Sequence, residues 1–219
     1  MSNAAHGASA HYDQKYFDWY KDLGKFGGWA NLTKFAEFIK LEDTVLDFGC
    51  GGGYLLQQLE CARKIGVEVN PVAAAEARNR IDQIYQNIED VASDSVDVIV
   101  SNNALEHTLH PLKELESLFR ILRPGGKIVM VVPCESVAYN YVPNDINFHL
   151  YSWSPMCIGN LMTHAGFRVE SSKPYIHKWP PRYLLIARFG RAVFEGACRI
   201  YGRIDRKWYQ VRAVAAKPL

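Results

Sequence analysis

The stretch VLDFGCGGGYLL places a carboxylate two residues before a cluster of glycines. Asp47, Gly49, Gly51 and Gly53 alternate with single residues, and glycine lets a backbone turn sharply or approach a ligand closely. A dinucleotide loop of the form GxGxxG requires a small residue where Tyr54 stands, so that pattern fails. A carboxylate here would repel a pyrophosphate and suits a ligand with cationic groups. The structural alternative is that Asp47 caps the following turn.

A second acid stands at the end of the next predicted strand. Glu68 lies in the stretch GVEV, one residue before its end, and an acid in that position of an α/β sheet can accept hydrogen bonds from both hydroxyls of a ribose. The same placement also occurs in nicotinamide-dependent enzymes. An NAD-type Rossmann oxidoreductase therefore stays open as an alternative, although Tyr54 and Asp47 both count against it.

Two histidines are candidates for a general base. His107 follows the predicted strand DVIVSN and would lie at the mouth of the crevice at the strand ends. The alternative for His107 is a structural role in shaping the turn before Pro111. His149 is the second candidate and lies in a loop-like segment, residues 134–154.

This 134–154 segment is the part of the chain most informative about a substrate. It interleaves aromatic rings with amides and acids, which suits a polyhydroxylated or aromatic acceptor, and loops at strand ends commonly carry function. The alternative is a covering loop whose polar groups satisfy its own turns. The residues that we expect to contact an acceptor are Tyr139, Tyr141, Asn147 and Trp153.

Alternating strands and helices must position these groups. Apolar strands are predicted at 44–48, 64–69, 84–88, 97–102, 127–133, 167–176 and 210–217, and helices at 53–62, 71–81, 111–122 and 154–166. RPGG, residues 123–126, reads as a turn. Such alternation predicts an α/β fold with a doubly wound, mostly parallel sheet and helices on both faces.

Taken together, these motifs resemble the class I S-adenosylmethionine-dependent methyltransferases over roughly residues 40–170. VLDFGCGGG is similar to that family's first motif, GVEVN to its second and NIEDV to its third. The long run from DVIVSN to KIVMVVP is similar to the fourth motif through the fifth strand, and the chain is similar to the ubiquinone-biosynthesis O-methyltransferases of this class. The resemblance implies a Rossmann-like, seven-stranded sheet with an antiparallel last strand.

The resemblance also implies a role for each matching residue, with S-adenosylmethionine as cofactor. Asp47 would face the amino group of the cofactor, and the glycines would let its methionine part lie close. Glu68 would hold the ribose hydroxyls, with Val69 against adenine. The family commonly has Asp where this chain has Asn87, a neutral and weaker acceptor for the adenine amino group. Ile88 would offer its backbone N–H to the ring, and Asn102 would border the methionine end.

The ubiquinone-type enzymes also carry an acid-x-x-Glu-His pattern that is linked to a divalent ion. This chain keeps Glu106 and His107 but has Asn103 in the first position, and we predict no metal. The expected reaction is methyl transfer to a small-molecule acceptor, at a hydroxyl oxygen. A catalytically inactive cofactor-binding or membrane-recruited module is a further alternative.

The two ends of the chain carry separate expectations. Residues 1–10 read as a tag, and 11–219 as one methyltransferase domain. Within it, the aromatic-rich stretch 11–40 reads as core packing or as an N-terminal helical lid. Residues 173–219 hold 11 Lys and Arg against 2 Asp and Glu, whereas residues 1–172 hold 14 against 21. The stretch 180–209 predicts a basic amphipathic insertion before the last strand, which could contact an anionic membrane or a lipid-linked acceptor or could pack and leave its arginines in solvent.

Composition narrows the remaining classes. The 219 residues lack a long apolar run, a signal-peptide pattern and a CxxC pair, so we expect a reduced, cytoplasmic enzyme. No nucleic-acid motif appears, and no nucleic-acid partner is expected.

Overall fold

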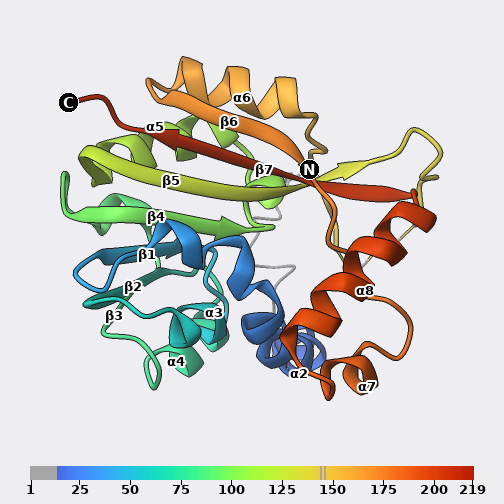
Figure 1. Ribbon diagram of the computed structural model, residues 1–219. Coiled ribbons are helices and arrows are strands. Elements are labelled where there is room, and N and C mark those ends of the chain that lie inside the picture. Colours follow the sequence, from blue (N-terminus) through green and yellow to red (C-terminus); the bar gives the residue numbers. More distant parts are fainter. Residues whose placement is uncertain (1–13, 144, 146) are drawn as a thin grey trace, which may run out of the picture.

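A seven-stranded sheet forms the centre of the computed structural model, which describes residues 14–143, 145 and 147–219 (Figure 1). The strand order is β3-β2-β1-β4-β5-β7-β6. Only β7 runs antiparallel to its neighbours, which confirms the predicted mostly parallel sheet with a reversed last strand. The strands are β1 (Thr44–Phe48), β2 (Arg63–Val67), β3 (Gln83–Tyr85), β4 (Val96–Asn102), β5 (Leu122–Glu135), β6 (Arg168–Tyr175) and β7 (Trp208–Ala216).

Helices cover both faces of the sheet because successive strand residues point to opposite sides. Leu46, Ile99 and Met130 join the core under α5 (Pro111–Ile121) and α6 (Pro155–His164). Val45 and Val100 pack on the other face against α3 (Tyr54–Gln58) and α4 (Pro71–Ala77). Both cores are closed and apolar, so the sheet is a rigid platform for the loops at its carboxyl edge.

Three further helices gather beyond that carboxyl edge (Figure 1). They are α2 (Gln14–Asn31), α7 (Tyr183–Ala187) and α8 (Arg191–Ile204). The short turns η1 (Leu32–Lys34) and η2 (Ala36–Phe38) lead from α2 to the sheet, and η3 (Ile88–Asp90) and η4 (Leu105–His107) follow β3 and β4. The predicted tag and residues 11–13 lie outside the described residues. Within the described part of the chain, no helix is both long and apolar enough to cross a membrane.

Several element boundaries differ from the prediction, and two of these differences change the local structure. The helix after the glycines ends at Gln58 rather than near 62, because Leu59 takes an extended conformation that buries its side chain. RPGG does not separate a helix from a strand; it forms a bulge inside β5, where Val96 pairs with Leu122 and Val98 with Lys127. Gly125 makes this possible with a positive φ of 78°.

Candidate active site

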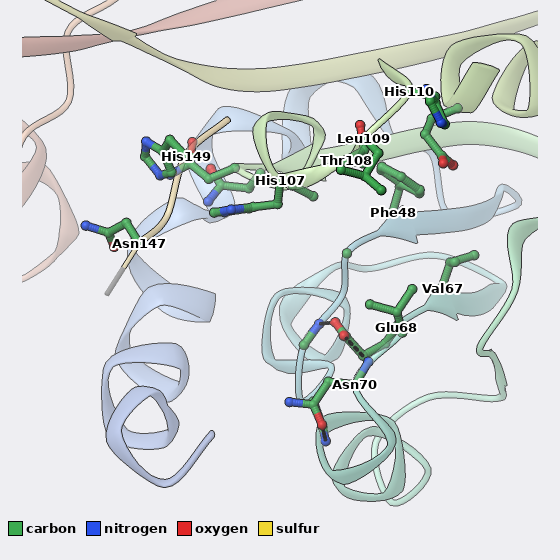
Figure 2. Close-up of a pocket in the computed structure, with 18 residues that line it drawn as sticks. Phe48, Val67, Glu68, Asn70, His107, Thr108, Leu109, His110, Asn147 and His149 are labelled. Carbon is green, nitrogen blue, oxygen red and sulfur yellow. Dashed lines mark hydrogen bonds between the residues drawn. The ribbon is translucent and has the colours of Figure 1, made fainter. Parts of the chain in front are cut away.

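A pocket of about 470 Å³ opens at the carboxyl ends of β1, β2 and β4 (Figure 2). Glu68 and Asn70 lie on one side of it, and His107, Asn147 and His149 on the other. The volume lies within the range of small-molecule sites, roughly 300–1,000 Å³. Its walls also include Phe48, Gly49, Gly51, Val67, Val69, Ala73, Asn102, Asn103, Ala104, Thr108, Leu109, His110 and Glu114.

The glycine loop forms the floor where two cavities meet. The Gly49 N–H donates to the Val67 carbonyl at 2.9 Å, which ties the loop to β2. Gly49 and Gly51 both have positive φ, at 77° and 53°. A Cβ on Gly49 would lie 2.4 Å from the Ala104 methyl, whereas a Cβ on Gly51 would meet open space. The Gly51 backbone therefore faces the cavity, as a close-approach loop requires.

Asp47 lies under this loop, in a second, smaller cavity of about 70 Å³ that shares Gly49, Gly51 and Asn102 with the first. The side chain is buried, and burial raises the pKa of its carboxyl well above its usual range, with a further rise from the nearby Glu68 charge. A cationic ligand group in this cavity would stabilise the ionised form.

Glu68 is held in place by two backbone donors. Its Oε2 accepts from the Gly51 N–H and its Oε1 from the Asn70 N–H, each at 2.8 Å. Asn70 in turn caps α4 by accepting from the Val72 N–H at 2.9 Å. Burial raises the pKa of Glu68, and these hydrogen bonds oppose the rise. Each carboxyl oxygen keeps a second lone pair, so a pair of ligand hydroxyls can still donate to it.

Helix α2 forms one wall of the smaller cavity. Gly24, Gly27, Gly28 and Asn31 line that cavity, and Gly28 approaches the Tyr54 backbone so closely that an added Cβ would lie 2.4 Å from the Tyr54 carbonyl oxygen. The segment predicted as a lid thus borders the cavity from Gly24 onward.

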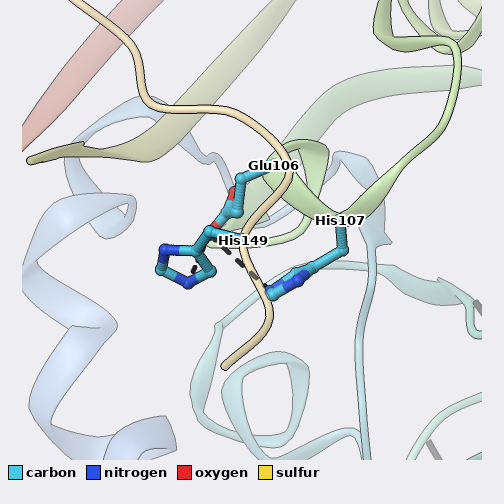
Figure 3. A group of neighbouring side chains, drawn as sticks. All are labelled: Glu106, His107 and His149. Carbon is cyan, nitrogen blue, oxygen red and sulfur yellow. Dashed lines mark ion pairs between the residues drawn. The ribbon is translucent and has the colours of Figure 1, made fainter. Parts of the chain in front are cut away.

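Three ionisable side chains, those of Glu106, His107 and His149, lie together where the two histidines line the larger pocket (Figure 3). His149 Nδ1 lies 2.7 Å from Glu135 Oε1, at the last residue of β5. The buried Glu106 has its Oε1 3.9 Å from His107 Nε2 and 4.0 Å from His149 Nε2. Burial raises the pKa of Glu106 to about 8, and the Glu135 charge adds to that rise, so this carboxyl is mostly neutral at pH 7.

The comparisons with known proteins agree with this geometry. Residues 15–172 match the family model described as "Methyltransferase domain". This chain belongs to the methyltransferase family. S-adenosylmethionine is its cofactor, and the NAD-dependent oxidoreductase alternative is not favoured.

Two relatives are similar in sequence to part of this chain. A probable S-adenosylmethionine-dependent methyltransferase of Mycolicibacterium smegmatis is 29% identical over 141 residues, 61% of this chain and 55% of that protein. A ubiquinone biosynthesis O-methyltransferase of Xanthomonas oryzae is 30% identical over 101 residues, 39% of this chain and 41% of that protein. The chain thus spans about half the length of these two relatives or less. The solved Haemonchus contortus phosphoethanolamine N-methyltransferase 2 with S-adenosylmethionine has a TM-score of 0.68 at 16% identity, covering 100% of this chain and 62% of that one.

The donor set of the methyltransferase fits its cofactor. The buried carboxyl group of Asp47 would suit the cationic end of the cofactor, and the two acceptor oxygens of Glu68 would suit its ribose diol. Gly51 leaves open space beside its backbone, and Val69, half-exposed on the pocket wall, can lie against a flat ring.

Asn102 joins both cavities, and its partner was not predicted from the sequence. Its Oδ1 accepts from Lys34 Nζ at 3.0 Å, and the same ammonium donates to Gln210 Oε1 at 2.8 Å. Lys34 is buried, and burial lowers the pKa of its ammonium to about 7 against smaller raising contributions from Glu195 and Cys198. From the sequence alone, Lys34 would be expected at the surface. Its burial depends on the amides of Asn102 and Gln210, which come from distant strands and so leave no local sign in the sequence.

Other predicted residues do not line the two cavities. Asn87 accepts from the Glu89 N–H at 3.1 Å as the cap of η3, and Ile88 is buried beside it. Gly53 packs towards Ile81 and Ala77 rather than into the cavities. Of the predicted acceptor contacts, only Asn147 lines the pocket; Tyr139 and Tyr141 are exposed, and Trp153 is buried under Tyr151.

His107 and His149 are both predicted from the sequence, but the residue that joins His149 to the sheet is not. Glu135 stands within the predicted loop 134–154, yet β5 continues to it, where it pairs with Trp208 of β7. The spacing between Glu135 and His149 in the sequence does not indicate that the two side chains meet. Glu106, His107 and His149 also offer ligand atoms that all lie within 4.8 Å of one another, close enough to hold a metal ion.

Proposed function

We propose that the methyltransferase transfers a methyl group to a hydroxyl oxygen of a small-molecule acceptor. The observation that carries this proposal is the 2.7 Å contact between His149 Nδ1 and Glu135 Oε1 at the edge of the pocket. A carboxylate that accepts from Nδ1–H fixes the histidine tautomer whose Nε2 lone pair can take a proton.

A hydroxyl acceptor explains why such a pair would be useful. The cofactor supplies a methyl group on a sulfonium, which is already activated, so the chain must align the acceptor and remove its proton. In our proposal His149 Nε2 takes the hydroxyl proton, and Glu135 holds the ring in place and stabilises its cationic form. Glu106, mostly neutral at pH 7, adds little charge beside Nε2.

The remaining polar groups orient the acceptor. Asn147 lines the same side of the pocket as His149 and can hydrogen-bond a second polar group of the acceptor. His107 lies with its ring centroid 5.1 Å from that of His149 and is the alternative base.

The names of the relatives support an oxygen acceptor but do not decide between oxygen and nitrogen. One relative is named a ubiquinone biosynthesis O-methyltransferase, whereas a solved structure of similar fold is named a phosphoethanolamine N-methyltransferase. The fold alone therefore does not select the acceptor atom.

A set of matched acceptors tests the proposal. Catechol, 2-aminophenol and 1,2-phenylenediamine share one ring and differ in the nucleophilic atoms, and nuclear magnetic resonance locates the transferred methyl group. We expect methylation of catechol oxygen and of the oxygen of 2-aminophenol. Methylation of nitrogen in both amines, with catechol left unchanged, would contradict the proposal.

His149→Gln identifies the base. It should lower kcat by about 10²–10⁴-fold, while the Kd for S-adenosylmethionine measured by calorimetry stays the same. His107→Gln is the matched control, since it changes the neighbouring ring but leaves the Glu135 pair intact. A larger loss of kcat in His107→Gln would transfer the role of base to His107.

A further inference from the structure

The helix pair α7–α8 exposes apolar side chains on a surface that points away from the sheet. We call it the α7–α8 surface. Phe189, Ile200 and Ile204 are the most exposed of these side chains, at 70%, 63% and 74%. Its apolar members are Leu184, Leu185, Phe189, Val193, Ile200 and Ile204.

Core packing does not account for this surface, because α8 is apolar on two sides. Its inner side buries Phe194 and Cys198 against Phe26 and Trp29 of α2. Val193, Ile200 and Ile204 are spaced seven and four residues apart, which places them on one line along the outer side of the helix. The expectation that the insertion merely packs an apolar face therefore explains the inner side alone.

The charge around this outer line is of one sign. Arg199 and Arg203 are exposed beside it on α8, Arg182 and Arg188 stand at the two ends of α7, and Arg206 follows α8. Within the described part of the chain, Arg182, Arg188, Arg203 and Arg206 form no salt bridge. The two acids of the segment are already engaged: Glu195 is buried against His177, and Asp205 lies 2.8 Å from Lys178. Exposed apolar side chains beside exposed arginines without a salt bridge match a partner that is apolar inside and anionic at its surface.

The position of the surface relates it to the pocket. Helix α2 lines the smaller cavity with Gly28 and Asn31, while its other side packs on Phe194 of α8. Thr33 Oγ1 also donates to Glu195 Oε1 of α8 at 2.7 Å. Helices α7 and α8 thus lie at the same edge of the sheet as α2, the helix that borders the smaller cavity (Figure 1).

We propose that the α7–α8 surface docks on a lipid bilayer that contains anionic lipids. The apolar side chains enter the boundary between headgroups and acyl chains, and the arginines contact the lipid phosphates. The orientation brings the pocket edge of the sheet towards the bilayer. This inference goes beyond the proposed function and does not depend on the acceptor atom.

Vesicle sedimentation of the full chain tests the proposal. The wild-type protein should sediment with vesicles of two parts phosphatidylcholine to one part phosphatidylglycerol, and much less with phosphatidylcholine alone. Binding should weaken as salt is added, because screening shortens the reach of the arginine charges. Arg199→Gln with Arg203→Gln should lower the partition coefficient by roughly 5-fold per arginine, from about 1 kcal/mol for each basic residue near an anionic surface.

The apolar contribution has its own variants and controls. Ile200→Ser with Ile204→Ser should abolish most vesicle binding without a loss of thermal stability, since both side chains are exposed. Leu41→Ser, an exposed apolar residue before β1, and Arg78→Gln, an exposed arginine after α4, should bind vesicles like the wild type.

Two results would overturn the proposal. One is binding that is equal for both vesicle types or unchanged in the Ile200 and Ile204 variant. The other is concentration-dependent self-association in analytical ultracentrifugation that this variant abolishes, with no vesicle binding, because the surface would then be an interface between copies of the chain. Methylation of catechol in the absence of vesicles measures the proposed function separately.

Discussion

Two adjacent glycines in α2 give opposite predictions for the same substitution. A Cβ on Gly28 would lie 2.4 Å from the Tyr54 carbonyl oxygen, and an ordinary contact needs about 3.4 Å, so α2 must move outward by about 1 Å. Overpacking of this size costs roughly 1–3 kcal/mol, against a gain of about 0.5–1 kcal/mol from replacing glycine in a helix. We expect Gly28→Ala to lose about 1–2 kcal/mol of unfolding free energy, which lowers Tm by roughly 2–8 °C.

Gly27→Ala is the matched control on the same helix. Its Cβ would meet Asn31 and Trp179 at 3.6 Å, which is ordinary contact, so only the entropic gain remains and Tm should rise by roughly 1–4 °C. Thermal unfolding followed by circular dichroism measures both variants, and calorimetric titration with S-adenosylmethionine measures the cavity that α2 covers. Gly28→Ala should bind the cofactor more weakly than Gly27→Ala. Equal stability and equal affinity in the two variants would refute the packing of α2 against the glycine loop.

Three further expectations concern single side chains. Since burial raises the pKa of Asp47 and a cationic ligand favours its ionised form, affinity for S-adenosylmethionine should increase with pH and binding should release a proton; calorimetry in two buffers of different ionisation enthalpy measures this, and Asp47→Asn should lose both effects. The folded-state pKa of Lys34, about 7, lies below its ordinary value of 10.5, so unfolding free energy should rise between pH 7 and 10 by at most roughly 4 kcal/mol; a Lys34→Met variant with the same slope in urea titrations would argue against this burial. Ser154 Oγ accepts from the Cys157 N–H at 3.1 Å, and Ser154→Ala should cost about 1 kcal/mol in urea unfolding, whereas a cost near zero would mean that water replaces the cap.

Sequence patterns were sufficient for the sheet and for one half of the site. The strand at 44–48, the glycines after it and Glu68 follow each other locally, so their geometry depends on a turn and two strand ends. The alternation of elements also predicted the order of layers, because parallel strands require crossover helices.

The other half of the candidate site depends on contacts between segments that are distant in the sequence. Glu135 belongs to β5 only because β7 continues to pair with it, and the loop that carries His149 returns to that strand end. Lys34 is buried because Asn102 and Gln210 satisfy its ammonium from two different strands. Leu59 leaves a helical pattern because the core accepts its side chain. None of these contacts has a local signature, so propensity and spacing could not predict them.

The placement of α2 between the smaller cavity and α8 has a consequence for the order of folding. Thr33 and Glu195 are separated by 162 positions, so their contact closes a very long loop. The entropic cost of closing this loop is larger than that of closing a local turn. A chain synthesised from its N-terminus carries the glycine loop and α2 long before Phe194 exists to cover the aromatic side of that helix. The residues that line the two cavities are therefore made before α8, and the helix that supports α2 over the smaller cavity is added only when nearly the whole chain has been made.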